Sequence, residues 1–322
     1  MAVYVNTNYS ALQGQRYLGN VQNQLTTTYQ RLSSGMRINS AKDDAAGLQI
    51  ADRLTSQING LNQGNRNASD GIALAQTMEA GMDEISGMLQ KMRTLTVQAA
   101  NGTNTSSDRD AISKEMSSLA TEVNRIAMKT TFAGKTVLNG LTADGSIFGT
   151  KANGATGGTA GDAGTMTLQV GSNKGDTISF TVNSVMFSKL NAPGDDIMKD
   201  GDVIFKTNKT TGEIVVNLGK ANFANANEKT YIGNVIDMFD KMIATVDSQR
   251  ADLGAIQNRL ESSIRNQSNV AANEADARSR IRDADFAEES ANLSQQSIIQ
   301  QAAASMLMQA NTRPQLGLSL LG

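Results

Sequence analysis

Residues 11–35 read ALQGQRYLGNVQNQLTTTYQRLSSG, and this stretch decides the fold. Its apolar or small residues recur at intervals of seven, three, four, three and four residues. This heptad spacing predicts a helix with a narrow apolar seam of the coiled-coil type. Gly35 can end that helix, because glycine readily adopts the left-handed conformation found just after a helix. The seam positions are Ala11, Leu18, Val21, Leu25, Thr28 and Leu32.

Helical spacing extends outward from this stretch over residues 1–130 and returns over residues 226–312. Small residues and methionines occupy many of the seam positions, which favours narrow contacts between long helices. The tightest spacing in the second helical stretch is formed by Ala75, Met78, Met82, Ile85, Leu89 and Met92.

Capping signals place the helix ends. Ser40 with Asp43, and Ser107 with Asp110, each have a hydroxyl residue three positions before a carboxylate, so we expect them to cap the second and third helices. Pro314 is expected to end the last helix.

The middle of the chain differs, because residues 145–175 contain nine glycines. Two β-hairpins are predicted there, Thr165–Val170 with Thr177–Val182, and Val203–Thr207 with Glu213–Leu218. The expected fold is therefore mainly α: a long coiled-coil-like helical rod with its N- and C-terminal helices paired, plus a small β-hairpin region in the middle.

Composition removes most enzyme classes. The chain has 322 residues, 39% of them hydrophobic, and contains no Trp, His or Cys. A Ser-His-Asp triad, a cysteine nucleophile and ordinary zinc or iron–sulfur sites are excluded. Carboxylate-only or magnesium chemistry stays open, but no clustered motif supports it, so neither catalysis nor a cofactor is expected. A net charge of −2 gives no basic surface for nucleic acid or an anionic membrane.

The N-terminus shows no basic segment followed by an apolar stretch of ~7–15 residues, so a secretory signal peptide is not expected. No window approaches ~18 consecutive apolar residues, so no membrane span is expected. Taken alone, this pattern indicates a cytosolic protein, unless the chain has another route out of the cell.

The terminal seams allow two interpretations. A pair of terminal helices would bury one stripe but remain marginal alone, because helices in water depend on tertiary packing. The ends could therefore become ordered on polymerisation, through contacts that generate a helical filament. The alternative is an ordinary multi-helix bundle with both ends docked, and periodicity alone does not decide between them.

Ala133-Gly134-Lys135-Thr136 is similar to the end of a phosphate-binding loop. The full pattern needs a glycine five residues before Gly134, where Lys129 stands, and a preceding strand rather than a helix. A turn into the β region is the better interpretation.

Five segments at the two ends of the chain form a distinctive pattern. They are Arg31–Gly47 (RLSSGMRINSAKDDAAG), Arg66–Ile72 (RNASDGI), Val97–Asn104 (VQAANGTN), Arg280–Ala287 (RIRDADFA) and the tail from Gln300 to Leu321. Together they resemble segments of bacterial flagellin. The resemblance covers roughly residues 1–140 and 226–322 and fades across the glycine-rich middle.

This resemblance implies four parts of the chain. The terminal helices would line the channel of a filament, the rod would pack outside them, and a small variable element would lie outermost. The expected ranges are 1–44 with 278–322 for the terminal domain, 45–142 with 226–277 for the rod, 143–190 for its β-hairpin part, and 191–225 for the outer element.

The resemblance also implies partners and a location. Export through the flagellum's own channel, without a cleaved signal peptide, would make the protein secreted and extracellular, as part of the flagellum. Expected partners are further copies of itself, a flagellar export chaperone at the C-terminal helix, a filament cap protein and hook–filament junction proteins.

Two host contacts follow from the resemblance. Gln90, Lys91, Arg93, Leu95 and Glu115 look like the patch bound by the Toll-like receptor for flagellin. Well-recognised family members have Arg at the position of Lys91, and the two cations are not equivalent, which argues against strong receptor activation. The tail residues similar to the segment sensed by cytosolic inflammasome receptors are Leu318, Leu320 and Leu321.

The sequence thus predicts a non-enzymatic subunit that self-assembles into the bacterial flagellar filament used for swimming. A hook–filament junction protein of the same superfamily is the nearest alternative, and a coiled-coil surface adhesin is an alternative of a different class. The predicted self-assembly seam is formed by Leu18, Val21, Leu25, Leu32, Phe286, Leu293, Ile299 and Met306.

Overall fold

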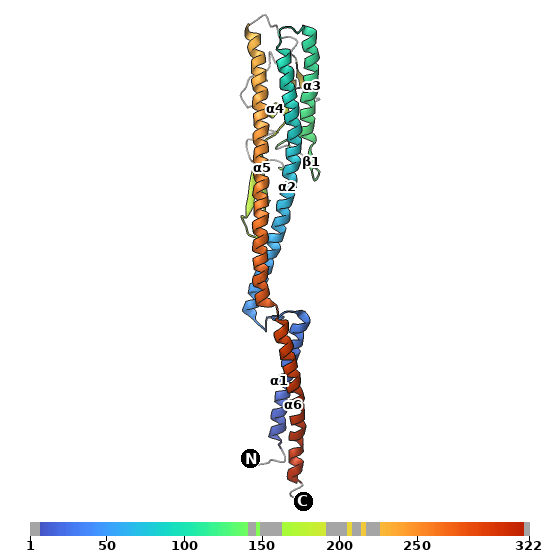
Figure 1. Ribbon diagram of the computed structural model, residues 1–322, viewed down its shortest axis with the longest axis vertical. Coiled ribbons are helices and arrows are strands. Elements are labelled where there is room, and N and C mark those ends of the chain that lie inside the picture. Colours follow the sequence, from blue (N-terminus) through green and yellow to red (C-terminus); the bar gives the residue numbers. More distant parts are fainter. Residues whose placement is uncertain are drawn as a thin grey trace, which may run out of the picture. The chain divides into compact units, whose positions relative to one another are not determined.

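A computed structural model describes residues 7–140, 146–148, 163–190, 205–207, 214–216 and 226–318. The described chain is mainly helical, as predicted (Figure 1). Its helices are α1 (Tyr9–Ser34), α2 (Ala45–Ala99), α3 (Ser106–Lys129), α4 (Phe187–Leu190), α5 (Ala226–Arg282) and α6 (Phe286–Leu318).

Short antiparallel strand pairs lie between the long helices in sequence. β1 pairs with β2, β3 with β4, and β5 with β6. The first predicted hairpin is confirmed, with Gln169 opposite Thr177. The described part of the second is antiparallel as predicted, with Thr207 opposite Ile214, while residues 203–204, 213 and 217–218 of that prediction lie outside the described residues. The strands are β1 (Thr131–Phe132), β2 (Lys135–Thr136), β3 (Gly164–Gln169), β4 (Thr177–Val182), β5 (Phe205–Thr207) and β6 (Ile214–Val216).

The turn between β1 and β2 is formed by Ala133 and Gly134, both with positive φ (51° and 80°). Two consecutive residues in this conformation form the tight turn that suits a two-residue hairpin. The segment Ala133–Thr136 is therefore a hairpin and not a phosphate-binding loop.

Two compact units make up the chain: Met1–Gly60 with Asn269–Gly322, and Leu61–Ser268. In the first, called here the terminal unit, α1 and α6 lie side by side and antiparallel (Figure 1). The predicted pairing of the N- and C-terminal helices is thereby confirmed. Gly35 follows α1 in the left-handed conformation, with φ of 70°, as its sequence position predicted.

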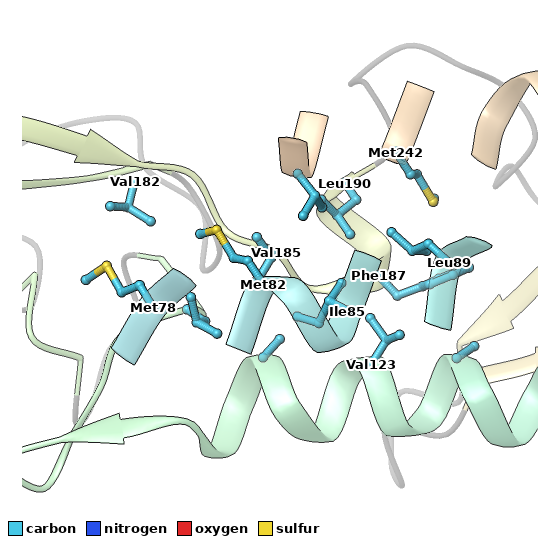
Figure 2. Close-up of a cluster of buried hydrophobic side chains, with 14 of the residues drawn as sticks. Met78, Met82, Ile85, Leu89, Val123, Val182, Val185, Phe187, Leu190 and Met242 are labelled. Atoms are coloured by element: carbon cyan, nitrogen blue, oxygen red, sulfur yellow. The ribbon is translucent and has the colours of Figure 1, made fainter. Parts of the chain in front are cut away.

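The second unit, called here the central unit, has a closed hydrophobic core. Side chains from α2, α3, α5, the β3–β4 hairpin and α4 meet in it, and the predicted methionine-rich seam of α2 lies at its centre (Figure 2). Phe187 packs against Phe239 with ring centroids 6.4 Å apart. The α2 side chains in the core include Met78, Met82, Ile85, Leu89 and Met92, all with 0% exposure.

The β3–β4 hairpin lies directly on α2 because two glycines allow close approach. A Cβ added at Gly64 would lie 2.0 Å from the carbonyl oxygen of Val170, and one at Gly71 would lie 2.4 Å from Leu168 Cδ1. Asn67 Nδ2 donates a 2.9 Å hydrogen bond to the carbonyl oxygen of Gln169 between these contacts. The hairpin position thus depends on the absence of side chains at two points of α2.

The second hairpin is held by hydroxyl groups of α3. The backbone N–H of Val216 donates to Ser117 Oγ at 2.8 Å, and that of Ile214 to Thr121 Oγ1 at 3.5 Å. Two hydroxyl groups four residues apart on α3 therefore accept hydrogen bonds from alternate N–H groups of β6. These bonds leave fewer unpaired backbone groups on the edge of β6 that faces away from β5.

Two predicted helix starts were wrong. Ser40 and Asp43 do hydrogen-bond, with Asp43 Oδ2 accepting from the Ser40 N–H at 2.9 Å, but they close a turn before the helix. The cap of α2 is Asp44, whose Oδ1 accepts from the N–H of Gly47 at 2.9 Å. For α3, the capping box uses Thr105 with Asp108 instead of Ser107 with Asp110. The spacing is the same in both candidates, so it could not identify the true start.

Pro314 does not end the last helix, contrary to prediction, since α6 continues to Leu318. A proline inside a helix removes one backbone hydrogen bond, that from its own position to the carbonyl four residues earlier. Here this carbonyl belongs to Ala310. It accepts a 2.8 Å hydrogen bond from Nδ2 of Asn8, the residue that caps the start of α1. A partner from another helix thus compensates the missing donor.

Candidate functional site: the terminal helix pair

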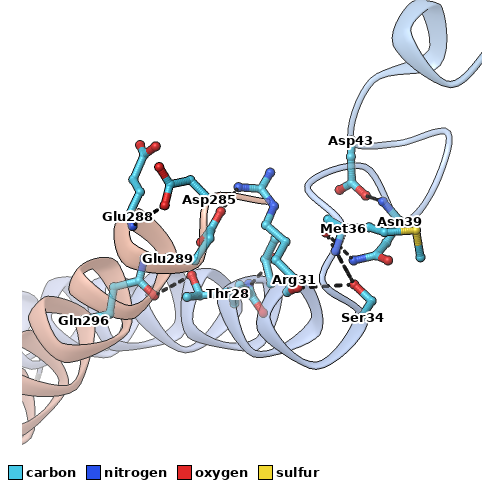
Figure 3. A network of polar contacts seen from close by, with 12 residues as sticks. Thr28, Arg31, Ser34, Met36, Asn39, Asp43, Asp285, Glu288, Glu289 and Gln296 are labelled. Carbon is cyan, nitrogen blue, oxygen red and sulfur yellow. Dashed lines mark hydrogen bonds and ion pairs between the residues drawn. The ribbon is translucent and has the colours of Figure 1, made fainter. Parts of the chain in front are cut away.

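Polar contacts connect α1 and α6 at several levels. Thr28 Oγ1 bonds Gln296 Oε1 at 3.2 Å, and one turn further on Arg31 Nη1 bonds Glu289 Oε1 at 3.0 Å (Figure 3). The Glu289 side chain is only 9% exposed, so its charge is largely removed from water and depends on Arg31. These contacts hold two helices that lie about 260 residues apart in sequence.

At one end of this pair, backbone hydrogen bonds join the turn that follows α1 to the turn that precedes α6. The Arg37 N–H donates to the carbonyl of Arg282 at 2.7 Å, and the Ala284 N–H donates to the carbonyl of Gly35 at 3.0 Å. Arg37 Nη2 adds a 2.7 Å bond to the Ile281 carbonyl. The turn after α1 and the turn before α6 therefore form one connected element, whose first half appears in Figure 3.

The predicted seam of α1 lies on its more covered side. Val21 is buried, and Leu18, Leu25 and Leu32 are partly buried. Their role in self-assembly stays a prediction, but the heptad spacing does mark the face of α1 that contacts α6.

The predicted seam of α6 divides into two groups. Leu293 and Ile299 are partly covered, whereas Phe286 and Met306 are 69% and 72% exposed. Within the described chain, α1 therefore does not bury the whole predicted seam.

Large apolar side chains are exposed along both helices of the pair. Between α1 and α6 lies a cavity of about 660 Å³, lined by Gly, Ala and Ser residues, by two glutamines and by the larger apolar residues Tyr17, Ile299 and Met306. The large exposed side chains of the two helices are Tyr9, Leu12, Tyr17, Tyr29, Phe286, Ile298, Met306 and Met308. An apolar surface of this kind is typical of a protein interface.

The predicted receptor patch lies in the central unit. Lys91 Nζ bonds Glu115 Oε1 at 2.7 Å, which joins α2 to α3, and both side chains are about half exposed. Arg93 forms a bidentate ion pair with Asp240 of α5, through Nε to Oδ1 and Nη2 to Oδ2. Hydrogen bonding to Arg93 lowers the pKa of Asp240, and the same bond raises the pKa of Arg93.

The remaining patch residues differ in access. Gln90 is exposed, whereas Leu95 is buried with 8% exposure. The structure thus pairs Lys91 with α3 and Arg93 with α5, and it buries Leu95. Of the predicted tail residues, Leu318 is the last residue of α6, its side chain lies outside the described part, and Leu320 and Leu321 lie outside the described residues altogether.

Sequence reasoning missed two contacts of the terminal pair. The role of Asn8 as the cap of α1 could have been predicted, since asparagine is a preferred helix cap. Nothing in the sequence indicates its hydrogen bond to α6. The pairing of Arg31 with Glu289 could not be found from spacing, because the two residues lie on different helices.

Among the described residues, no group of three or more Asp or Glu side chains is arranged to hold a metal ion. In the same part of the chain, no helix has both the length and the hydrophobicity needed to cross a membrane.

Comparisons with known proteins identify the family. Residues 5–143 match the bacterial flagellin N-terminal helical region, and residues 236–321 match the bacterial flagellin C-terminal helical region. The unmatched residues between them include the glycine-rich middle, where the resemblance seen in the sequence also fades.

Individual relatives agree with these matches. Flagellin B of Vibrio cholerae is 37% identical over 376 residues, and Flagellin B of Vibrio anguillarum is 38% identical over 383 residues, with 100% of both chains covered in each case. A solved structure described as a flagellar hook-associated protein from Vibrio parahaemolyticus superposes with a TM-score of 0.53. It covers 75% of this chain and 100% of its own, and at 18% identity it supports the fold alone. The chain belongs to the bacterial flagellin family.

Proposed function

We propose that the terminal helix pair of this flagellar filament subunit is completed by neighbouring copies of the same chain. The observation that carries the proposal is the open apolar surface of α1 and α6, where Tyr9, Phe286 and Met306 are each more than two-thirds exposed. As a member of a structural protein family, the chain acts by assembling and not by catalysis.

The energetics favour assembly at this surface. Burying a large apolar side chain contributes about 1.5–3 kcal/mol, so several such residues per subunit supply a substantial driving force. Two paired helices alone are marginal, which makes α1 and α6 the part of the chain that gains most from neighbours. Contacts between different surfaces of identical subunits, when they do not close a ring, generate a helical filament.

Leu25→Asp tests the seam. A carboxylate at this partly buried position should weaken the packing of α1 on α6 and abolish seeded filament growth, measured by light scattering and electron microscopy. Gln24→Asp, which adds the same charge at the neighbouring exposed position, is the matched control and should still polymerise. Normal growth of the Leu25→Asp chain would contradict the proposal.

Removal of the ends tests the same mechanism more broadly. Deleting about 40 residues from each end removes the whole of α1 and α6 but leaves the central unit, which has its own closed core. The shortened chain should keep its helical circular dichroism and resist protease, yet fail to polymerise. Filaments formed by the shortened chain would exclude the terminal pair as the assembly element.

The hook–filament junction protein is the nearest alternative. Whole-chain relatives at 37–38% identity are named flagellins, which favours the filament subunit. A junction protein would stop after a limited number of copies, whereas this chain should extend seeds to micrometre length. Short assemblies of fixed size would favour the alternative.

The export route, the further partners and the domain boundaries of the chain are also part of the proposal. Export without a cleaved signal peptide, a chaperone bound to the C-terminal helix, a cap protein and junction proteins fit a subunit that assembles outside the cell. The proposed parts are the terminal domain, 1–44 with 278–322, the rod, 45–142 with 226–277, its hairpin part, 143–190, and the outer element, 191–225.

A host Toll-like receptor is a further proposed partner of the patch at Lys91, Arg93 and Glu115. Lys91 is engaged by Glu115, and Arg93 by Asp240, so receptor binding at this surface competes with ion pairs inside the subunit. Lys91→Arg should raise signalling in a receptor reporter cell line, because a planar guanidinium can bind two acceptors at once. An unchanged or lower signal would argue against this contact.

The tail residues Leu318, Leu320 and Leu321 are the proposed segment for inflammasome receptors. Replacing the three leucines by alanine should reduce cytosolic recognition when the protein is delivered into macrophages. Equal responses to both proteins would argue against this assignment.

A further inference from the structure

One carbonyl group of α6 cannot make its usual helical hydrogen bond. In an α-helix the carbonyl of each residue accepts from the N–H four positions later. Pro314 stands four residues after Ala310 inside α6, and proline has no N–H. Ala310 is therefore a position where α6 offers a backbone acceptor to another helix.

Asn8 uses this acceptor. Its Nδ2 donates to the Ala310 carbonyl at 2.8 Å, while its Oδ1 accepts from the N–H of Ala11 at 3.1 Å and caps α1. One side-chain amide thus starts α1 and attaches that start to a single carbonyl of α6. Carbonyls in regular helical turns already have backbone donors, so they would be poorer partners for the same amide.

The opposite end of the pair is also fixed by a specific contact. The Glu289 carboxylate, buried on α6, pairs with Arg31 at 3.0 Å. Sliding α1 along α6 by one heptad would separate this pair and leave a buried charge without its cation. The same slide would place Asn8 against carbonyls with regular helical donors.

We propose that Asn8 and Pro314 form a register lock between α1 and α6, in which Pro314 frees the Ala310 carbonyl and Asn8 binds it. The lock sets which α1 residues lie beside which α6 residues, including Tyr17 and Met306 on the shared cavity. Its consequence for polymerisation rests on the proposed function, because neighbouring copies would contact this composite surface.

The absence of cysteine from the chain makes the register measurable. A Cβ built at Gly14 lies 4.0 Å from Leu307 Cβ, within the ~3.5–4.5 Å range of disulfides, so Gly14→Cys with Leu307→Cys reports the observed register. Gly14→Cys with Gln300→Cys, one heptad away, reports a shifted register. The full chain carrying either pair is oxidised both in solution and after seeded assembly, and the intrachain disulfide is quantified by mass spectrometry.

Asn8→Ser is the decisive variant, since serine retains the cap but is too short to reach α6. It should lower the ratio of observed-register to shifted disulfide about fivefold, the effect of one net hydrogen bond. Pro314→Ala restores the helical N–H, so adding Asn8→Ser to that chain should change the ratio no further. Asn8→Ala, which removes both functions, should also fray the start of α1.

Two results would overturn the lock: an unchanged ratio in the Asn8→Ser chain, or an equal effect of Asn8→Ser with and without Pro314. Either result can be obtained even if polymerisation behaves as proposed. Conversely, failure of the unsubstituted chain to extend seeds would contradict the proposed function, while the disulfide ratio in solution would still test the lock.

Discussion

The central unit and the terminal unit use the same heptad spacing with different results. In the central unit α2 is covered by α3, α5 and a hairpin, and Met82, Ile85 and Leu89 are fully enclosed. In the terminal unit α1 and α6 pair with each other, and large side chains such as Tyr9 and Met306 remain exposed. A seam therefore becomes a closed core only where a third element covers it, and an open seam is available for association.

The largest expected effect on stability is found by comparing the same leucine-to-alanine change in the two units. Leu89→Ala removes a fully buried side chain from the central core and should cost about 2–5 kcal/mol in the free energy of unfolding. Leu12→Ala makes the same change on α1, where the side chain is 52% exposed, and should cost within about 0.5 kcal/mol. Guanidinium denaturation of both purified chains measures the difference.

In filament growth the order of the two variants should be the reverse of their order in loss of stability. The Leu12→Ala chain should lose more filament growth than the Leu89→Ala chain, because the proposed function places the exposed Leu12 side chain against neighbouring copies. Equal stability losses at the two positions would mean that the terminal pair is as enclosed as the central core.

Glycine substitutions test how closely the central core is packed. Gly64→Ala would place a methyl group 2.0 Å from the Val170 carbonyl oxygen, so the hairpin must move, at an expected cost of about 1–3 kcal/mol. Gly87→Ala is the matched control on α2, since nothing lies within 4 Å of its added Cβ. It should stabilise the chain by roughly 0.5–1 kcal/mol, because alanine is the better helix former. Thermal unfolding should shift in opposite directions, and two shifts of the same sign would contradict the observed hairpin contact.

The fold was largely predictable because its main signals are local. Heptad spacing located α1 and the buried seam of α2, and strand alternation located both hairpins. Helix ends were less predictable, since Thr105 and Ser107 both precede an acidic residue by three positions. Only the backbone geometry identifies Thr105 as the cap.

The candidate site was less predictable because its key contacts join distant parts of the sequence. The Pro314 signal was interpreted locally, as a helix end, whereas its effect depends on Asn8 from the opposite end of the chain. The exposure of Phe286 and Met306 likewise depends on how much of an apolar seam one neighbouring helix can cover. The spacing of apolar residues in the sequence does not predict that coverage.

A capping variant gives a smaller effect that should stay within the central unit. Thr105 Oγ1 accepts from the N–H of Asp108, and Asp108 Oδ2 accepts from the N–H of Thr105. Thr105→Ala removes the first of these bonds together with the bond from the hydroxyl to Asp108 Oδ2, and keeps the backbone N–H at position 105. We expect a loss of about 1 kcal/mol in unfolding free energy, measured with urea. Thr103→Ala, an exposed change in the preceding turn, is the control. Filament growth of both variants should match the unsubstituted chain, since neither touches the terminal pair.

The smallest effect concerns the ion pair between Arg93 and Asp240 in the central unit. Its hydrogen bonds lower the folded-state pKa of Asp240 below the ordinary 3.8, so this contribution to stability is complete above that value and is lost as pH falls through the lowered pKa. Both side chains are more than 40% exposed, which keeps the contribution small and sensitive to salt. Asp240→Asn should therefore lose slightly less stability than the unsubstituted chain between about pH 6 and about pH 3, measured by denaturation midpoints. Asp237→Asn, at an exposed carboxylate on the same helix, is the comparison variant. A larger acid sensitivity in the Asp240→Asn chain would have the wrong sign for a carboxylate stabilised in its charged form.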